Sequence, residues 1–93
     1  MNKITIKDIS MLTESRQQIL LSLTNGARPL AYITKITKRP LTTLWYAVEW
    51  LMDEKFVTIK MQKISKFYGK DIVMYDLTPR GKKLCNFITK VIK

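Results

Sequence analysis

The chain has 93 residues, of which 17 are basic and 7 acidic, so its formal net charge is +10. This length suits one domain with one hydrophobic core, and 46% apolar residues exclude a disordered chain. No segment approaches the roughly 20 apolar residues of a membrane span, and residues 1–8 contain no apolar signal core. We therefore expect a soluble, intracellular protein without a membrane partner.

The residue types argue against most catalytic chemistry. The chain has no histidine and one cysteine, which excludes His-based acid–base catalysis, a Cys/His dyad and Cys/His zinc sites. The acidic residues are scattered singly except for Asp53-Glu54. We expect no metal and no organic cofactor, and an enzyme is the least supported class. The single cysteine, Cys85, is either a free thiol or half of a bridge between two chains.

The positive charge is the most informative feature of the composition. It predicts attraction to a polyanion, which means nucleic acid, an anionic membrane surface or an acidic partner. The alternative is a generally Lys-rich surface without a specific partner. We favour nucleic acid.

The first third of the chain predicts an N-terminal arm and a helix. Residues 1–12 fit either an edge strand or a helical arm. A helix is predicted from about Glu14 to Asn25, with Thr13 as its N-cap and Gly26 as its stop. Pro29-Leu30 then interrupts the chain and fits a short strand.

The middle of the chain predicts two helices around a turn. A short helix covers residues 31–37, with Ile33 and Ile36 facing inward. Lys38-Arg39-Pro40 forms a turn, because the residue before a proline avoids the helical conformation. A longer helix over about 41–54, which Thr42 or Thr43 helps to cap, buries one stripe. That stripe consists of Leu44, Val48 and Leu51.

From residue 56 the apolar period changes to two. Residues 57–62 alternate like a strand and residues 72–77 are a second strand-like run. A basic loop with Gly69 near its tip joins them into a hairpin. Thr78-Pro79 opens the last helix, with threonine as N-cap and proline at the first helical position.

This order predicts an α+β winged helix-turn-helix, with a three-helix core, a two-stranded wing and a C-terminal dimerisation helix. Residues 1–93 form a single domain in this prediction. Its parts are an N-terminal arm at 1–12, the helix-turn-helix at 31–54, the wing at 56–77 and the C-terminal helix at 78–93.

Two segments resemble winged-helix DNA-binding regulators of the PadR and MarR kind. Residues 43–57 are similar to the recognition-helix stretch of that family. Residues 75–84 are the closer match, since they follow the family's Tyr-x-Leu-Thr-x-x-Gly pattern at the end of the wing. Lys55 stands where the family has glycine, which implies a tighter or less strained turn, and Trp45 stands where small polar or tyrosine residues are usual. The short, Lys/Ile-rich chain is also similar to small winged-helix proteins of viruses of hyperthermophilic archaea.

The resemblance implies that the helix over 41–54 enters the major groove of double-stranded DNA. The hydroxyls of Thr42, Thr43 and Tyr46 would then bond phosphates or bases, although both threonines can equally serve as helix caps. We expect Trp45 and Trp50 to pack against other elements rather than to read bases. Because this helix has no Arg or Asn at an obvious base-reading position, specificity would come partly from DNA shape.

Basic residues flank that helix on both sides and are the predicted phosphate contacts. The alternatives are a solvated turn and lysines that protect exposed strand edges. The predicted contacts are Lys35, Lys38 and Arg39 in the turn and Lys63, Lys66 and Lys70 in the hairpin.

The last helix has an apolar stripe too broad for one small domain to cover, which predicts a homodimer. The predicted interface residues are Leu84, Cys85, Phe87, Ile88, Val91 and Ile92. If Cys85 lies near the two-fold axis, it can form an interchain disulfide, a bond that intracellular proteins of hyperthermophiles do contain.

The predicted function is sequence-specific binding of double-stranded DNA by a homodimer that regulates transcription. Two alternatives stay open: a winged-helix module for protein–protein assembly, and a non-specific nucleic-acid binder. Basic residues confined to the turn and the wing would favour DNA, whereas an even spread would weaken that case. A small-molecule effector is compatible with the resemblance, but the sequence does not indicate a pocket for one.

Overall fold

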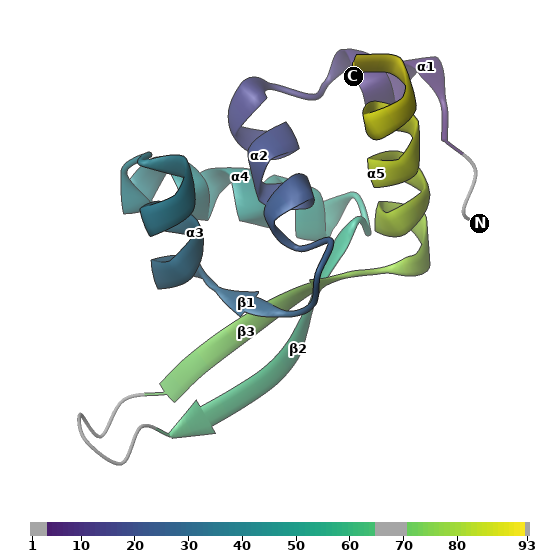
Figure 1. The fold of residues 1–93 in the computed structure, drawn as a ribbon. Helices are drawn as coiled ribbons and strands as arrows, with labels where there is room; N and C mark the ends of the chain where they lie inside the picture. Colours follow the sequence, from purple (N-terminus) through teal and green to yellow (C-terminus); the bar gives the residue numbers. More distant parts are fainter. Residues whose placement is uncertain (1–3, 65–70, 93) are drawn as a thin grey trace.

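The computed structural model describes residues 4–64 and 71–92 (Figure 1). The helices gather on one side of the molecule, and two long strands extend away from them as a hairpin (Figure 1). The predicted α+β class is confirmed. The elements are α1 (Ile6–Ser10), α2 (Glu14–Ser22), β1 (Arg28–Pro29), α3 (Leu30–Thr37), α4 (Leu41–Asp53), β2 (Val57–Ile64), β3 (Asp71–Leu77) and α5 (Pro79–Ile92).

The N-terminal arm is helical, which decides between the two predicted alternatives. The Thr5 hydroxyl accepts the Asp8 N–H at 3.2 Å, and the Asp8 carboxylate accepts the Thr5 N–H at 3.0 Å. This reciprocal capping box begins α1. A helix of one turn is not stable alone, and an ion pair of 3.0 Å between Asp8 and Arg80 ties it to the start of α5.

Helix α2 begins as predicted but ends at Ser22 rather than at Asn25. The Thr13 hydroxyl accepts the Arg16 N–H at 3.3 Å and caps the helix. At the other end, the hydroxyls of Ser22 and Thr24 donate to backbone carbonyls three residues back, a local alternative to the helical pattern. Gly26 completes the turn at a φ of 130°.

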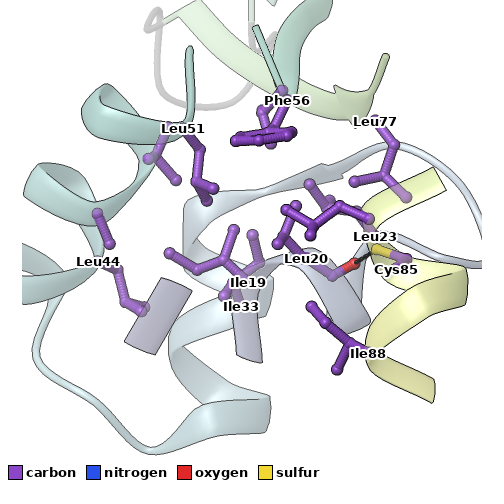
Figure 2. Packing of buried hydrophobic residues seen from close by; sticks show 14 residues of the cluster. Ile19, Leu20, Leu23, Ile33, Leu44, Leu51, Phe56, Leu77, Cys85 and Ile88 are labelled. Atoms are coloured by element: carbon purple, nitrogen blue, oxygen red, sulfur yellow. Dashed lines mark hydrogen bonds between the residues drawn. The ribbon is translucent and has the colours of Figure 1, made fainter. Parts of the chain in front are cut away.

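The core lies where α2, α3, α4 and α5 meet the base of the sheet (Figure 2). The predicted stripe on α4 is confirmed, since Leu44, Val48 and Leu51 are buried. The prediction for Ile36 is wrong: its side chain is 51% exposed. Ile33 is the α3 residue that is buried in the core, and Leu30 packs against the core from the start of α3. Ile36 lies at the edge between α2 and α3, beside Leu21.

The turn from α4 into β2 packs directly against the start of α5. Lys55 adopts the left-handed conformation with a φ of 66°, so the expectation of a less strained turn at this position is wrong. The Thr78 hydroxyl accepts the Gly81 N–H at 3.0 Å, and the Thr78 N–H donates to the Phe56 carbonyl at 3.1 Å. The predicted cap of α5 is therefore confirmed.

The wing is an antiparallel hairpin, as predicted. β2 and β3 pair from Val57↔Leu77 to Ile64↔Asp71, with an irregularity between Ile59 and Met61. β1 pairs with the other edge of β3, which gives the strand order β1-β3-β2. Strand β1 thereby joins the root of the wing to the start of α3 (Figure 1).

Candidate nucleic-acid interface

A sharp turn sets the direction in which α4 leaves the helix-turn-helix. Lys38 ends α3 with a φ of 57°, and its N–H donates to the Thr34 carbonyl at 2.8 Å. Pro40 is the N-cap of α4, and no side chain caps this helix. The predicted capping by Thr42 or Thr43 is therefore wrong. Both side chains are exposed in the first turn of the helix.

One face of α4 projects outward from the core. Thr42, Trp45, Tyr46 and Glu49 share this face, because residues three and four positions apart are neighbours on a helix. The Trp45 side chain is 46% exposed and that of Tyr46 is 62% exposed. Their rings meet edge to face, with centroids 5.2 Å apart. The expectation that Trp45 is packed is therefore wrong, because Leu44 and its stripe already occupy the core side of the helix.

Apolar side chains line a shallow hollow beside this face. Its lining residues are Leu30, Leu41, Thr42 and Trp45, and its volume is about 270 Å³. Leu41 is 56% exposed. The sequence offered one signal for this surface: position 45 falls off the register of the buried stripe.

Trp50 lies on another side of α4 and packs at the edge of the core, as predicted. Its ring stacks with that of Phe56 at 6.2 Å. The Arg16 guanidinium lies over the Trp50 ring, 4.0 Å from its centroid. Trp50 is thus a structural residue that joins α2 to α4 and to the turn before β2.

The exposed cations near α4 are lysines. Lys35 on α3, Lys38 in the turn and Lys60 on β2 are all exposed. Arg39 instead turns toward α2, where it pairs with Glu14 at 3.2 Å and hydrogen-bonds the Gln18 side chain. The predicted hairpin residues Lys66 and Lys70 lie outside the described residues, as does the side chain of Lys63.

The arginines of this chain contact aromatic rings and polar groups within the chain itself. Arg16 and Arg80 stack on the rings of Trp50 and Phe56, and Arg80 also donates to the Glu54 carbonyl at 3.0 Å. Arg28 lies 4.8 Å from the centroid of the Tyr32 ring. Together with Arg39, these are the only arginines in the sequence. The lysines Lys82, Lys83 and Lys90 are exposed on α5, so basic residues are not confined to the turn and the wing.

The apolar stripe of α5 packs largely inside its own chain. Leu84, Cys85 and Ile88 are at most 3% exposed, whereas Phe87 is 38% exposed. The side chains of Val91 and Ile92 lie outside the described ones. The dimer stays a prediction, and Phe87 is the predicted contact that remains accessible.

Cys85 does not suit an interchain disulfide. Its Sγ donates to the Leu20 carbonyl at 3.4 Å within the core (Figure 2). Burial raises the pKa of this thiol to about 11. A disulfide requires the two sulfurs to lie about 2 Å apart, and Cys85 is 3% exposed. The burial of this thiol argues against the predicted bridge through Cys85, which stays a prediction.

Within residues 4–64 and 71–92, no group of three or more His, Cys, Asp or Glu side chains is placed to hold a metal ion. Over the same part of the chain, no helix combines the length and the apolar character needed to cross a membrane.

A helix-turn-helix followed by a two-stranded wing defines this chain as a winged-helix protein. Known structures share this fold. A PadR family transcription regulator from Clostridium difficile superposes with a TM-score of 0.75 at 14% identity, covering 84% of this chain and 85% of that one. Bacillus subtilis PadR, solved in complex with operator DNA, gives a TM-score of 0.72 at 23% identity, covering 80% of this chain and 45% of its own.

Larger regulators share the fold as well. The adhesin competence repressor AdcR from Streptococcus pyogenes gives a TM-score of 0.71 at 15% identity, with 86% of this chain covered. This chain spans 56% of the AdcR chain, a little more than half of its length. No family model and no curated protein matches the sequence. The predicted likeness to PadR-type winged-helix regulators is confirmed, and the likeness to viral proteins stays a prediction.

Proposed function

We propose that this protein binds double-stranded DNA through α4 and regulates transcription in the cell that contains it. The observation that carries the proposal is the exposed face of α4. The first turn of this helix presents the Thr42 and Thr43 hydroxyls directly after a basic turn, in the geometry with which a recognition helix enters the major groove. The shared fold with Bacillus subtilis PadR, solved with operator DNA, supports this reading.

The lysines around α4 have a different role from the residues on the exposed face of this helix. Lys35 and Lys38 flank the start of the helix and contact phosphates on one side, while Lys60 does so from the wing. Lysine binds phosphate as a point charge, so these contacts set affinity and register without reading sequence. The proposed role is binding without catalysis.

We also propose that the protein acts as a homodimer through α1 and α5. Ile6 is 86% exposed on α1 and Phe87 is 38% exposed on α5. The ion pair between Asp8 and Arg80 links these two helices, and α1 and α5 lie on the same side of the molecule (Figure 1). A two-fold dimer would present two α4 helices about 34–36 Å apart to successive major grooves.

The DNA proposal is tested by fluorescence anisotropy with a labelled duplex over a series of salt concentrations. Wild type should bind with a steep salt dependence, and the Lys35→Gln, Lys38→Gln double variant should lose affinity. Its log–log slope should fall by about 0.9 for each phosphate contact removed. Lys90→Gln is the matched control, because Lys90 is an exposed lysine in the last turn of α5.

Two results would contradict the DNA proposal. One is the absence of duplex binding at low salt, which would favour the protein-assembly alternative. The other is an equal loss of affinity in Lys90→Gln, because attraction would then come from the overall charge of the chain and not from the α3–α4 turn.

The dimer proposal is tested by sedimentation equilibrium. Wild type should sediment with twice the mass of one chain, and the Ile6→Lys, Phe87→Lys double variant should sediment as a monomer. Leu21→Lys is the control, since Leu21 is 41% exposed on α2 and outside the proposed interface. A monomeric wild type would refute this part of the proposal.

A further inference from the structure

The exposed face of α4 lacks the side chains that usually read purines. Arginine or lysine recognises guanine, and asparagine or glutamine recognises adenine, in each case through the major-groove edge. Helix α4 contains none of these four residue types. Elsewhere in the chain, every arginine is engaged with a ring or with an acidic or amide side chain of its own protein.

In place of these polar side chains, the exposed face of α4 presents apolar ones. Trp45 and Leu41 expose about half of their side-chain surface and border the shallow hollow, together with Thr42. The adjacent Tyr46 ring braces Trp45 edge to face at 5.2 Å. In the major groove, the C5 methyl group of thymine is the apolar feature that such a surface can recognise.

We propose that Trp45, with Leu41 and Thr42, forms a methyl-binding surface that makes this protein prefer thymine-rich DNA. The inference rests on the proposed function and names the sequence class that the α4 face selects. Lys35 on α3 and Lys38 in the turn that precedes α4 are exposed, which suits apolar contact at the groove floor and phosphate contact at its edge. Trp45 thereby determines specificity, while the lysines supply affinity.

The test separates the major-groove methyl group from the rest of the base pair. Four duplexes of about 24 base pairs, long enough for two half-sites one helical turn apart, are compared by anisotropy. The first contains only A·T pairs in mixed order, and the second replaces every thymidine with deoxyuridine. The third contains only G·C pairs, and the fourth carries 5-methyldeoxycytidine, which places a methyl group in the same groove.

Wild type should bind the thymidine duplex more tightly than the deoxyuridine duplex, by about fourfold for each methyl group contacted. The methylated G·C duplex should likewise bind more tightly than the unmethylated one. Trp45→Ala and Leu41→Ala should bring both ratios toward one. Two controls should leave the ratios unchanged: Leu21→Ala, which alters an exposed apolar residue of α2, and Lys35→Gln, which should weaken binding to all four duplexes alike.

The outcomes separate this inference from the proposed function. Equal affinity for the thymidine and deoxyuridine duplexes, with tight binding to both, would overturn methyl recognition and leave DNA binding intact. A methyl preference that survives in both Trp45→Ala and Leu41→Ala would overturn the assignment to this face. Failure to bind any of the four duplexes would overturn both proposals and favour a protein partner for the patch.

Discussion

Replacing Gly81 with alanine should destabilise this protein, although alanine is the better helix former. Gly81 lies in the first turn of α5, where intrinsic propensity alone would favour alanine by about 1 kcal/mol. A Cβ atom at this position would lie 2.0 Å from the carbonyl oxygen of Phe56 and 3.3 Å from Leu77 Cδ2. The Phe56 carbonyl is backbone and also accepts the Thr78 N–H, so α5 or the α4–β2 turn must move.

The size of the effect follows from that distance. Carbon and oxygen normally approach no closer than about 3.3 Å, so the backbone must shift by more than an ångström. Overpacking of a tight site costs about 1–3 kcal/mol and occasionally more, and a clash with backbone belongs at the upper end. After the gain in helix propensity, we expect a net loss of about 2 kcal/mol in the free energy of unfolding. For a domain of this size, that lowers Tm by about 8–16 °C.

Thermal and urea unfolding, followed by circular dichroism, measure this change. Asn86→Ala is the matched control, because Asn86 is exposed on the same helix and should leave the stability nearly unchanged or slightly higher. If Gly81→Ala unfolds at the temperature of wild type or above it, the close approach of α5 to the α4–β2 turn is refuted.

Two further predictions concern titratable groups. Desolvation acts to raise the pKa of Asp8, but hydrogen bonds from Thr5 and the charge of Arg80 outweigh it and hold that pKa below its ordinary 3.8. The stability contributed by this carboxylate is present above pH 3.8 and is lost as the pH falls through its lower folded value. Asp8→Asn should therefore flatten the acid limb of the stability curve, and an unchanged limb would argue against the α1–α5 link. The Cys85 thiol, with its pKa raised to about 11, should react with Ellman's reagent at pH 8 far more slowly in the native than in the unfolded protein. Rapid native labelling, or a reducible dimer on gels, would contradict its burial.

Features set by local patterns were predictable from the sequence. The α4 stripe follows from helical spacing, and the start of α5 follows from Thr78-Pro79, because both depend on residues close in the chain. The wing follows from the period-two alternation of residues 57–62 and the strand-like run of residues 72–77. These signals were sufficient for the fold class.

Features that depend on distant partners were not predictable. Helix α1 relies on an ion pair between Asp8 and Arg80, which lie 72 residues apart. The apolar stripe of α5 showed that the helix packs against something, yet periodicity alone does not distinguish a second chain from the α2 helix that covers Cys85.

The exposed position of Trp45 was missed for a related reason. A large aromatic residue is normally packed against other side chains. In α4, however, the buried stripe already fills the core side of the helix without Trp45. Only the three-dimensional arrangement shows that Leu30, Leu41 and Trp45 together border one surface. The sequence therefore pointed to α4 as the candidate site, whereas the chemistry of its surface required the fold.

Sequence recognition by α4 is tested most directly by selection of bound duplexes from a randomised DNA pool, at near-physiological salt and with competitor DNA present. We expect enrichment of a two-fold symmetric, thymine-rich motif whose half-sites lie one helical turn apart. Retention of duplexes without any enriched motif would contradict sequence-specific recognition by α4. The absence of retained DNA would contradict the proposed function itself.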